Sequence, residues 1–253
     1  MKIEVISCLK DNYSYLIIDE KIKKTCVIDP SESEPIINFL EKNNLKLNYI
    51  LNTHHHYDHV GGNIELKKKY GAKVVGFEKD FKRIPEIDIH LTDGEIWKED
   101  NFEAKIIHIP GHTLGHICFH FYNDNNLFTG DTLFSLGCGR IFEGTYQQMF
   151  SSLEKIKKLP SKTKIYCGHE YTLQNSKFCI QYDKENQNLI KKIKEINEKL
   201  KNNQPTIPST IEDELKNNIF LRSDNENIKT NLNIGTSSTL ATFSKLRDLK
   251  DNF

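Results

Sequence analysis

The chain lacks a long apolar run. Hydrophobic side chains make up 37% of its 253 residues, yet no uninterrupted apolar segment approaches the roughly 20 residues that a membrane-spanning helix needs. The first 17 residues alternate as a strand does and lack the basic start, apolar centre and small-residue cleavage site of a secretory signal. We therefore expect a globular, cytoplasmic protein that binds no membrane.

Paired cysteine motifs are also missing. The six cysteines are scattered without CxxC spacing, at Cys8, Cys26, Cys118, Cys138, Cys167 and Cys179. This scatter argues against both a zinc knuckle and a disulfide framework. We expect six buried thiols in a reducing compartment.

An excess of charge is absent as well, because 35 Lys+Arg balance 35 Asp+Glu. No global field would draw the chain to nucleic acid, so an anionic partner must be recognised by local residues. Arginine is rare and occurs only at Arg83, Arg140, Arg222 and Arg247. Where a lysine-rich chain still uses arginine, a rigid guanidinium that binds a carboxylate can be the reason.

Up to about residue 170, short apolar runs alternate with amphipathic stretches, which predicts an α/β fold. The expected strands are 3–6, 15–18, 25–28, 49–52, 73–75, 105–109, 116–122, 127–129 and 164–167. The expected helices are 35–43, 63–70 and 146–158. Ser33 is a candidate cap for the first of these helices, and Pro35 takes an early helical position.

The pattern changes after residue 170. A long charged helix is predicted there by one apolar stripe, at Leu189, Ile193, Ile196 and Leu200. The stretch NNQPTIPST interrupts it, and shorter helical segments follow at 212–217 and 238–251. We predict an α/β domain over residues 1–170 and an all-α domain over residues 171–253.

Four apolar runs each end in residues that can bind a metal: YILNTHHHYDH, IIHIPGH, LFTGD and KIYCGH. In an α/β sheet, sites assemble at the carboxyl ends of strands. If the four ends converge, they bring together seven nitrogen and oxygen donors: His54, His56, Asp58, His59, His112, Asp131 and His169. Seven donors are too many for one tetrahedral zinc ion but suit two metals that share a carboxylate.

The run H-x-H-x-D-H is the most specific of these signals. Alternation along a strand places His54 and His56 on one face and His55 on the other. We therefore predict that His55 is not a ligand. Lone histidines are more often structural, and we assign no role to three of them: His90, His108 and His120.

The motifs resemble those of a known family. THHHYDHVGG, PGHTLGH, LFTGD and CGHEYT are similar to the motif set of the metallo-β-lactamase superfamily, and specifically of glyoxalase II, the hydroxyacylglutathione hydrolases. DNYSYLI near the start and IPST and RDLKDNF near the end extend the resemblance over essentially the whole chain. It implies an αββα sandwich as the catalytic domain and a helical substrate-binding domain.

The resemblance also implies how the ligands divide. One metal would bind His54, His56 and His112, and the other Asp58, His59 and His169, with Asp131 bridging the two. The two divalent ions are expected to be zinc, with iron or manganese as alternatives for nitrogen and oxygen ligands. The shared water would supply a metal-bound hydroxide as the nucleophile, with Asp58 and Asp131 as the catalytic carboxylates.

The implied reaction is hydrolysis of S-D-lactoylglutathione to glutathione and D-lactate, a step of methylglyoxal detoxification. The implied substrate contacts are Arg140, Phe142, Tyr171, Arg247 and Lys250. Phe142 stands where the family often has tyrosine, so one hydrogen bond to the tripeptide is missing. Arg247 and Lys250 share one helical face, and in the family these positions clamp the glycine carboxylate of glutathione.

Three residues remain as supporting candidates. Thr113 and His116 lie in the loop GHTLGH, and His116 could either hydrogen-bond a ligand or simply pack. Arg222 follows the segment NNIFL, where we expect a structural role.

Other functions stay open. A persulfide dioxygenase of the same superfamily would handle a glutathione adduct with a single iron. A β-lactamase would need export and would lack the bridging Asp131, and a flavodiiron enzyme would need glutamate in place of His56. A non-catalytic metal-binding protein would keep the fold, although every ligand position is filled here. We expect a monomer.

Overall fold

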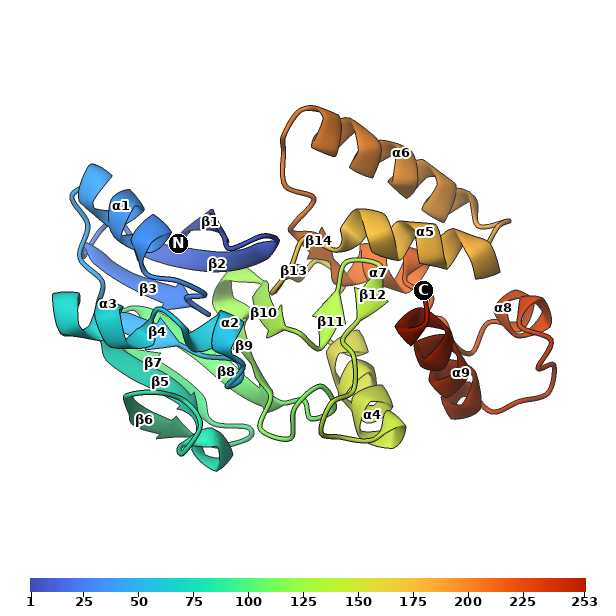
Figure 1. The fold of residues 1–253 in the computed structure, drawn as a ribbon, viewed down its shortest axis with the longest axis horizontal. Coiled ribbons are helices and arrows are strands. Elements are labelled where there is room, and N and C mark those ends of the chain that lie inside the picture. Colours follow the sequence, from blue (N-terminus) through green and yellow to red (C-terminus); the bar gives the residue numbers. More distant parts are fainter. The chain divides into compact units, whose positions relative to one another are not determined.

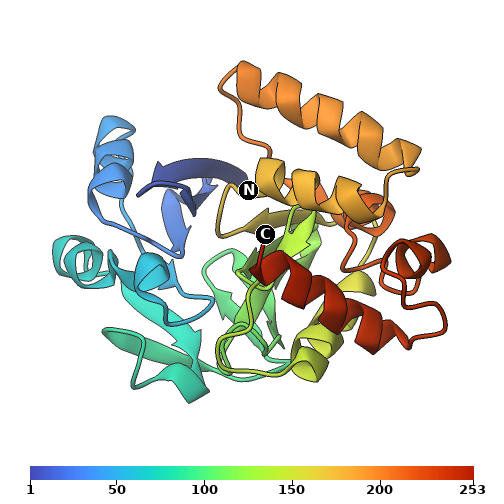
Figure 2. The same cartoon turned by 45° about the vertical axis from the view of Figure 1, so that its right-hand side comes forward.

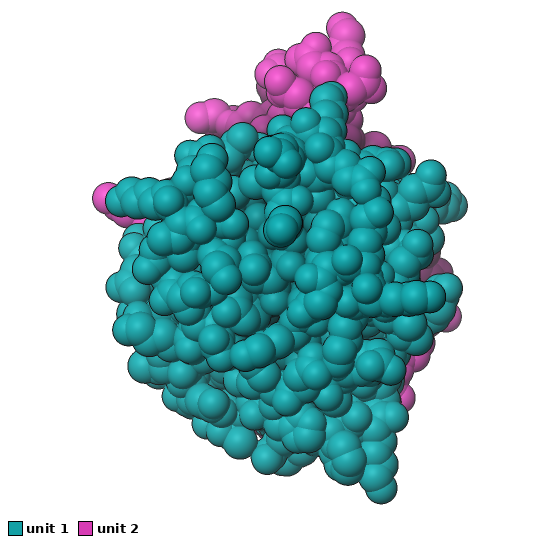
Figure 3. Space-filling model, turned by 90° about the vertical axis from the view of Figure 1, so that its left-hand side faces the viewer, with its two compact units in different colours: residues 1–108, 115–130 teal, residues 109–114, 131–253 magenta.

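The computed structural model describes all residues from Met1 to Phe253, which form two compact units. Unit 1 comprises Met1–His108 and Gly115–Gly130, and unit 2 comprises Ile109–Leu114 and Asp131–Phe253 (Figure 3). The predicted domain boundary at residue 170 follows a different criterion and stays a prediction.

Unit 1 contains a mixed sheet with the strand order β1-β2-β3-β4-β5-β6 (Figure 1). Its strands are β1 (Lys2–Cys8), β2 (Asn12–Asp19), β3 (Lys24–Ile28), β4 (Tyr49–Leu51), β5 (Lys73–Phe77) and β6 (Ile87–Leu91). The first three strands pair antiparallel, whereas β3 to β6 pair parallel. Parallel pairing requires crossover connections, and here these include the helices α1 (Glu34–Lys42) and α3 (Asn63–Tyr70).

The two helices cover one face of this sheet. Ile36 and Leu40 of α1 and Leu66 of α3 are buried in one cluster with strand residues such as Val27 and Ile50. Ser33 precedes α1, but its hydroxyl does not cap the helix; it hydrogen-bonds Glu65 instead. Ser33 therefore occupies the N-cap position, as predicted, but makes no side-chain capping hydrogen bond, and the helix forms where it was predicted.

A second set of strands in unit 1 is antiparallel, in the order β10-β9-β8-β7. These strands are β7 (Ile96–Glu99), β8 (Phe102–His108), β9 (Ile117–Phe121) and β10 (Asn126–Gly130), and short 3-10 turns lie at Glu78–Asp80 and Tyr122–Asp124. Aromatic contacts join the two sheets, with ring centroids 5.4 Å apart for both Tyr15–Phe128 and Tyr49–Trp97. Unit 1 is thus a sheet-on-sheet core covered by helices.

Unit 2 is mainly helical (Figure 2). Its helices are α4 (Tyr146–Lys157), α5 (Thr172–Tyr182), α6 (Gln187–Lys201), α7 (Ile211–Asn217), α8 (Glu226–Asn231) and α9 (Thr239–Asp251). Its short strands are β11 (Leu133–Phe134), β12 (Gly137–Cys138), β13 (Lys164–Cys167) and β14 (Ser209–Thr210). Helix α5 packs on α6 and α4 packs on α9 (Figures 1 and 2).

The strands predicted from the sequence are confirmed, and so are the predicted helices. Sequence patterns did not predict the strands β6, β7, β11, β12 and β14 or the helices α5 and α8, nor the short helix that follows β4 at Tyr57–Val60. Leu189 and Ile196 of the predicted apolar stripe on α6 are buried. All six cysteines are buried and form no disulfide, as expected. No helix of the chain has the length and apolar character to cross a membrane.

Glu214 is a fully buried carboxyl group on α7. Its Oε2 accepts hydrogen bonds from the backbone N–H of Leu136 (2.8 Å) and from Asn218 Nδ2 (2.9 Å). Burial raises the pKa of Glu214 from 4.5 to about 7 despite these hydrogen bonds. The residue therefore ties α7 to the loop between β11 and β12 and titrates near neutral pH.

We predict that Glu214→Gln gains stability relative to wild type as the pH rises. Because the folded state binds this proton more tightly than the unfolded chain, the contribution to stability is full below pH 4.5 and is lost as pH rises toward 7. Between these limits the difference in unfolding free energy should change by about 3 kcal/mol. Urea unfolding from pH 4.5 to 8 measures it, with exposed Glu212→Gln as the control. Parallel pH profiles for wild type and Glu214→Gln would contradict the prediction.

Candidate metal centre

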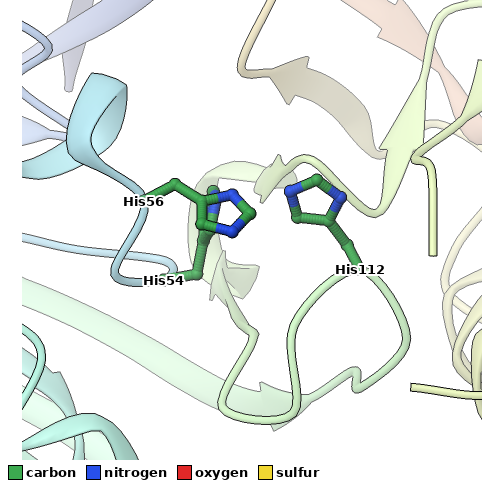
Figure 4. A group of neighbouring side chains, drawn as sticks. All are labelled: His54, His56 and His112. Carbon is green, nitrogen blue, oxygen red and sulfur yellow. The ribbon is translucent and has the colours of Figure 1, made fainter. Parts of the chain in front are cut away.

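In unit 1 the predicted ligands follow strand β4. His54 and His56 project from the segment between β4 and the short helix α2 (Tyr57–Val60) (Figure 4). Helix α2 itself carries Asp58 and His59. The ring centroids of His54 and His56 are 4.7 Å apart, and those of His54 and His59 are 4.2 Å apart. Unit 1 therefore holds a dense histidine cluster at the carboxyl end of a parallel strand.

Asp29 organises this cluster from the neighbouring strand. It follows β3, the parallel partner of β4, and its buried carboxylate accepts hydrogen bonds from Thr53 N (2.7 Å) and Thr53 Oγ1 (2.6 Å). Its Oδ2 also lies 3.0 Å from His59 Nδ1. Sequence reasoning missed Asp29, although the run TCVID ends in a carboxylate just as LFTGD does.

The hydrogen bonds of Asp29 determine where the imidazole protons are. Because a carboxylate only accepts, Nδ1 of His59 carries the proton and Nε2 carries the lone pair. The Thr53 hydroxyl donates its one proton to Asp29, so it accepts from His54 Nδ1 at 3.0 Å. Both rings thus leave Nε2 available to a metal, the tautomer expected of histidine ligands with an outer hydrogen-bond partner.

Asp58 is oriented by a second residue that sequence reasoning left without a role. Asn12 Nδ2 donates to both the backbone carbonyl and the Oδ2 of Asp58, each at 3.0 Å. Asp58 Oδ2 lies 3.7 Å from His59 Nε2. Asn12 belongs to the motif DNYSYLI, which the sequence analysis linked to the family but to no particular role. The structure gives that motif a physical function.

His55 faces away from the cluster, as the alternation predicts. Its Nδ1 lies 3.1 Å from Oδ2 of the fully buried Asp80, which also accepts from Arg83 Nε at 3.1 Å. Burial acts to raise the pKa of Asp80, but the hydrogen bonds from His55 and Arg83 outweigh it and lower that pKa. A Cβ on Gly115 would lie 2.1 Å from Asp80 Oδ1, so this carboxylate needs glycine in PGHTLGH.

His116 packs against a predicted ligand. Its ring stacks on that of His54 with centroids 4.5 Å apart and an interplanar angle of 17°. Gly130 adjoins both: it has a positive φ of 47°, and a Cβ there would lie 2.9 Å from His116 Nε2. Gly130, the glycine of LFTGD, therefore leaves room for the His116 ring that stacks on His54.

In unit 2, three predicted ligands come together. His112 lies on the loop after β8 (Figure 4), while Asp131 follows β10 and His169 follows β13. Asp131 Oδ2 lies 3.6 Å from His112 Nε2 and 3.2 Å from His169 Nε2. The Nδ1 of His112 donates to the carbonyl of Arg140 at 2.7 Å, so His112 has the same tautomer as His54 and His59. One carboxylate therefore lies between two imidazoles.

A cavity of about 410 Å³ lies next to these residues in unit 2. Two predicted metal ligands, His112 and Asp131, line it. All five predicted substrate contacts also line it: Arg140, Phe142, Tyr171, Arg247 and Lys250. Cys138 belongs to the lining too, but burial raises the pKa of its thiol, so it is no ready nucleophile.

The cations of the cavity differ in exposure. The Arg247 side chain is 5% exposed and donates to Cys138 O (2.6 Å) and Asp251 Oδ1 (2.9 Å). The Arg140 side chain is 55% exposed. Burial and the charge of Arg247 lower the pKa of the half-buried Lys250. The cavity therefore offers positive charge for an anionic ligand.

Three further candidate residues bond or pack against other residues of unit 2. Arg222 forms an ion pair with Asp183 inside unit 2, as its expected structural role requires. Thr113 is buried, and its carbonyl accepts from the N–H of Gly111 at 3.1 Å. Tyr171 stacks on His169, with centroids 4.6 Å apart and an interplanar angle of 6°.

Taken together, the donors in the two units fit divalent metals. Imidazole nitrogens and carboxylate oxygens suit zinc, iron and manganese. In unit 1 the ligand atoms of Asp29, His54 and His59 lie within 4.8 Å of one another. Since Asp29 already accepts from Thr53 and His59, it supports the ligands from outside. The histidine cluster is therefore able to bind metal.

Comparison with known proteins first defines the class. Residues 10–169 match the family model described as the Metallo-beta-lactamase superfamily, and the chain belongs to this superfamily. The crystal structure of ETHE1 from Myxococcus xanthus has the same fold, with a TM-score of 0.69 and 21% identity over 100% of this chain and 91% of that chain. The predicted fold class is confirmed.

The rest of the chain narrows the class. Residues 170–253 match the model described as Hydroxyacylglutathione hydrolase C-terminus. Hydroxyacylglutathione hydrolase from Pelagibacter ubique is 66% identical over 100% of both chains, and that from Rhodopseudomonas palustris (strain BisB5) is 43% identical over 99% of this chain and 98% of its own. The chain belongs to the hydroxyacylglutathione hydrolase family. The C-terminal match favours this family over the dioxygenase alternative.

We predict that Asp29→Asn weakens metal binding about 10- to 100-fold, the usual effect of removing a partner that orients a histidine ligand. The amide can still accept from Thr53, but it lacks the charge that holds the Nδ1 proton of His59. Metal content after dialysis against graded chelator measures the loss. His55→Asn is the control and should retain metal as wild type does. Equal loss from both variants would refute these roles.

Proposed function

We propose that the chain is a binuclear-metal thioesterase that hydrolyses S-D-lactoylglutathione, and other S-2-hydroxyacylglutathiones, to glutathione and D-lactate in methylglyoxal detoxification. One observation carries the proposal: a single cavity of unit 2 is lined by His112 and Asp131 and also by Arg140, Arg247 and Lys250. Such a lining suits a ligand with a reactive thioester at one end and a carboxylate at the other. Membership of the hydroxyacylglutathione hydrolase family supports the same reaction.

The proposed ligands are the seven donors predicted from the sequence. His54, His56 and His112 would hold one metal, and Asp58, His59 and His169 the other, with Asp131 bridging the two. When bound, the two divalent cations, zinc in our proposal, would acidify water to a pKa of about 7 and polarise the thioester carbonyl. Iron or manganese could serve with the same ligands.

The residues of the chain perform the remaining tasks. Asp58, held by Asn12, orients the attacking water and can take its proton. Asp29 keeps the Nδ1 of His59 protonated, and the Arg140 carbonyl does the same for His112. These hydrogen bonds hold the rings so that no reorientation is needed during the reaction.

The thiol part of the substrate meets the basic side of the cavity. Arg140, Arg247 and Lys250 supply the charge that binds the carboxylates of glutathione, and Tyr171 supplies a further contact. Phe142, 62% exposed, offers an apolar ring 5.2 Å from that of His112. It lacks the hydroxyl that a tyrosine would add, so we expect a weaker contact there.

We further propose how the chain is organised and where it acts. Residues 1–170 form the catalytic domain and residues 171–253 the helical substrate-binding domain. All proposed ligands and contacts come from one chain, so we propose that a monomer suffices. Six buried thiols that form no disulfide suit the reducing conditions of the cytoplasm.

We predict that the purified, metal-replete protein releases thiol from S-D-lactoylglutathione, because its metal donors and its cations line one cavity. A thiol reagent follows the release continuously. A chelator should abolish turnover, and added zinc should restore it. Turnover that does not exceed background, or that ignores the chelator, would refute the proposed function.

We predict opposite kinetic effects at the two ends of the cavity. Asp131→Asn should lower kcat at least about 100-fold because it weakens the bridge between the metals. Arg247→Ala should mainly raise KM, by about 10-fold or more, because it removes a charged hydrogen-bond donor.

Steady-state kinetics on both variants separates these effects. Lys245→Ala, an exposed lysine on the same helix as Arg247, is the control and should match wild type. A fall in kcat for Arg247→Ala, with a raised KM for Asp131→Asn, would reverse our assignment.

A further inference from the structure

Helix α9 ends with a carboxylate that joins two cations of the cavity. Asp251 Oδ1 accepts from Arg247 Nη2 at 2.9 Å and lies 3.2 Å from Arg140 Nε. The backbone carbonyl of Asp251 also lies 3.4 Å from Arg140 Nη2. Arg140 comes from the loop after β12 and Arg247 from α9 itself. One side chain therefore connects guanidinium groups from two separate elements.

The carboxylate is not part of the cavity wall. Arg140, Arg247 and Lys250 line the cavity, whereas Asp251 does not. A carboxylate that competed with the ligand would have to lie among the lining residues. Asp251 instead supports the two arginines from beside the cavity. The side formed by Arg140, Arg247 and Lys250 stays net positive, because the one negative charge of Asp251 stands against three positive ones.

Support of this kind matters most for Arg140. Its side chain is 55% exposed, and an exposed arginine has many rotamers to lose when it binds a ligand. Restraining it beforehand lowers that loss and strengthens binding. Arg247 needs the partner for another reason: it is nearly buried, and the carboxylate satisfies one of its terminal nitrogens while Cys138 O satisfies the other.

The same contact reaches a proposed metal ligand. The backbone carbonyl of Arg140 accepts from His112 Nδ1 at 2.7 Å. The loop that carries Arg140 is therefore held at its side chain by Asp251 and at its main chain by His112. Recognition of the thiol carboxylate and placement of His112 depend on the same short segment.

We propose that Asp251 is a positioning residue that makes the cavity selective for thiols that carry a carboxylate. The inference rests on the proposed function and adds to it a residue that touches neither substrate nor reacting atoms. Without the carboxylate, Arg140 turns toward solvent and Arg247 loses a partner. Binding of the substrate carboxylate then weakens, while the thioester still reacts at the metal centre.

The test compares two thioesters. Asp251→Ala should raise KM for S-D-lactoylglutathione about 10-fold and leave kcat within about 2-fold. It should barely affect S-D-lactoyl-N-acetylcysteamine, which has no carboxylate on its thiol part. Asp251→Asn, which can still accept hydrogen bonds, should fall between Asp251→Ala and wild type.

Asp248→Ala is the matched control. Asp248 lies on the same helix and carries the same charge, but it bonds the hydroxyl of Tyr146 and neither arginine. It should leave both substrates unaffected. An equal rise in KM for both substrates with Asp251→Ala would show a merely structural role, and an unchanged or lower KM for the glutathione thioester would overturn the proposal.

Binding without turnover separates this inference from the proposed function. Calorimetry with S-methylglutathione reports carboxylate recognition even if the protein hydrolyses nothing. A 10-fold weaker binding by Asp251→Ala, with binding by Asp248→Ala unchanged, would support the role of Asp251 even if the thioesterase assay failed. Equal affinity of wild type and Asp251→Ala would overturn it even if the assay succeeded.

Discussion

The hydrogen bonds of one buried carboxylate underlie the arrangement of the histidines in unit 1. Asp29 binds Thr53 through both backbone and hydroxyl, and it binds the ring of His59. Through Thr53 it also determines which nitrogen of His54 carries the proton. Removing a charge from water is costly unless it is fully hydrogen-bonded, and Asp29 meets that condition with the donors that the metal site requires. The same hydrogen bonds therefore satisfy a buried charge of unit 1 and orient its candidate ligands.

In unit 2, too, hydrogen bonds and close charges orient the candidate ligands, but a different carboxylate and a backbone carbonyl supply them. Asp131 lies between His112 and His169, and the Arg140 carbonyl keeps the Nδ1 of His112 protonated. Asp251 then holds the side chain of Arg140. A chain of charged and polar contacts thus runs from the end of α9 to His112, a candidate metal ligand. The loop that carries Arg140 is thus held at two points, by Asp251 at the side chain and by His112 at the main chain.

Much of this could be predicted from the sequence. The strands that carry the ligands were recognised because short apolar runs end in polar residues, and the alternation in THHHYDH assigned His55 to the face that bonds Asp80. Strands β6 and β7 were not predicted because they are short, with five and four residues, and each buries only one side chain. Helix α5 was not predicted because its buried face includes polar residues such as Asn175 and Ser176, so the sequence shows no apolar stripe there.

The residues that orient the candidate ligands and the arginines could not be predicted from local sequence patterns. Each of these residues bonds a residue that lies far away in the chain: Asp29, Asn12, Asp80 and Asp251. The sequence around each of them does not indicate which residue that partner is. The spacing of ligands is a local property, since it follows from the geometry of one strand or turn. The sequence alone therefore determined the fold class, the family resemblance and the candidate ligands. Only the tertiary structure decided the tautomers, the orientation of Asp58 and the support of the arginines, because those depend on hydrogen bonds between segments that folding brings together.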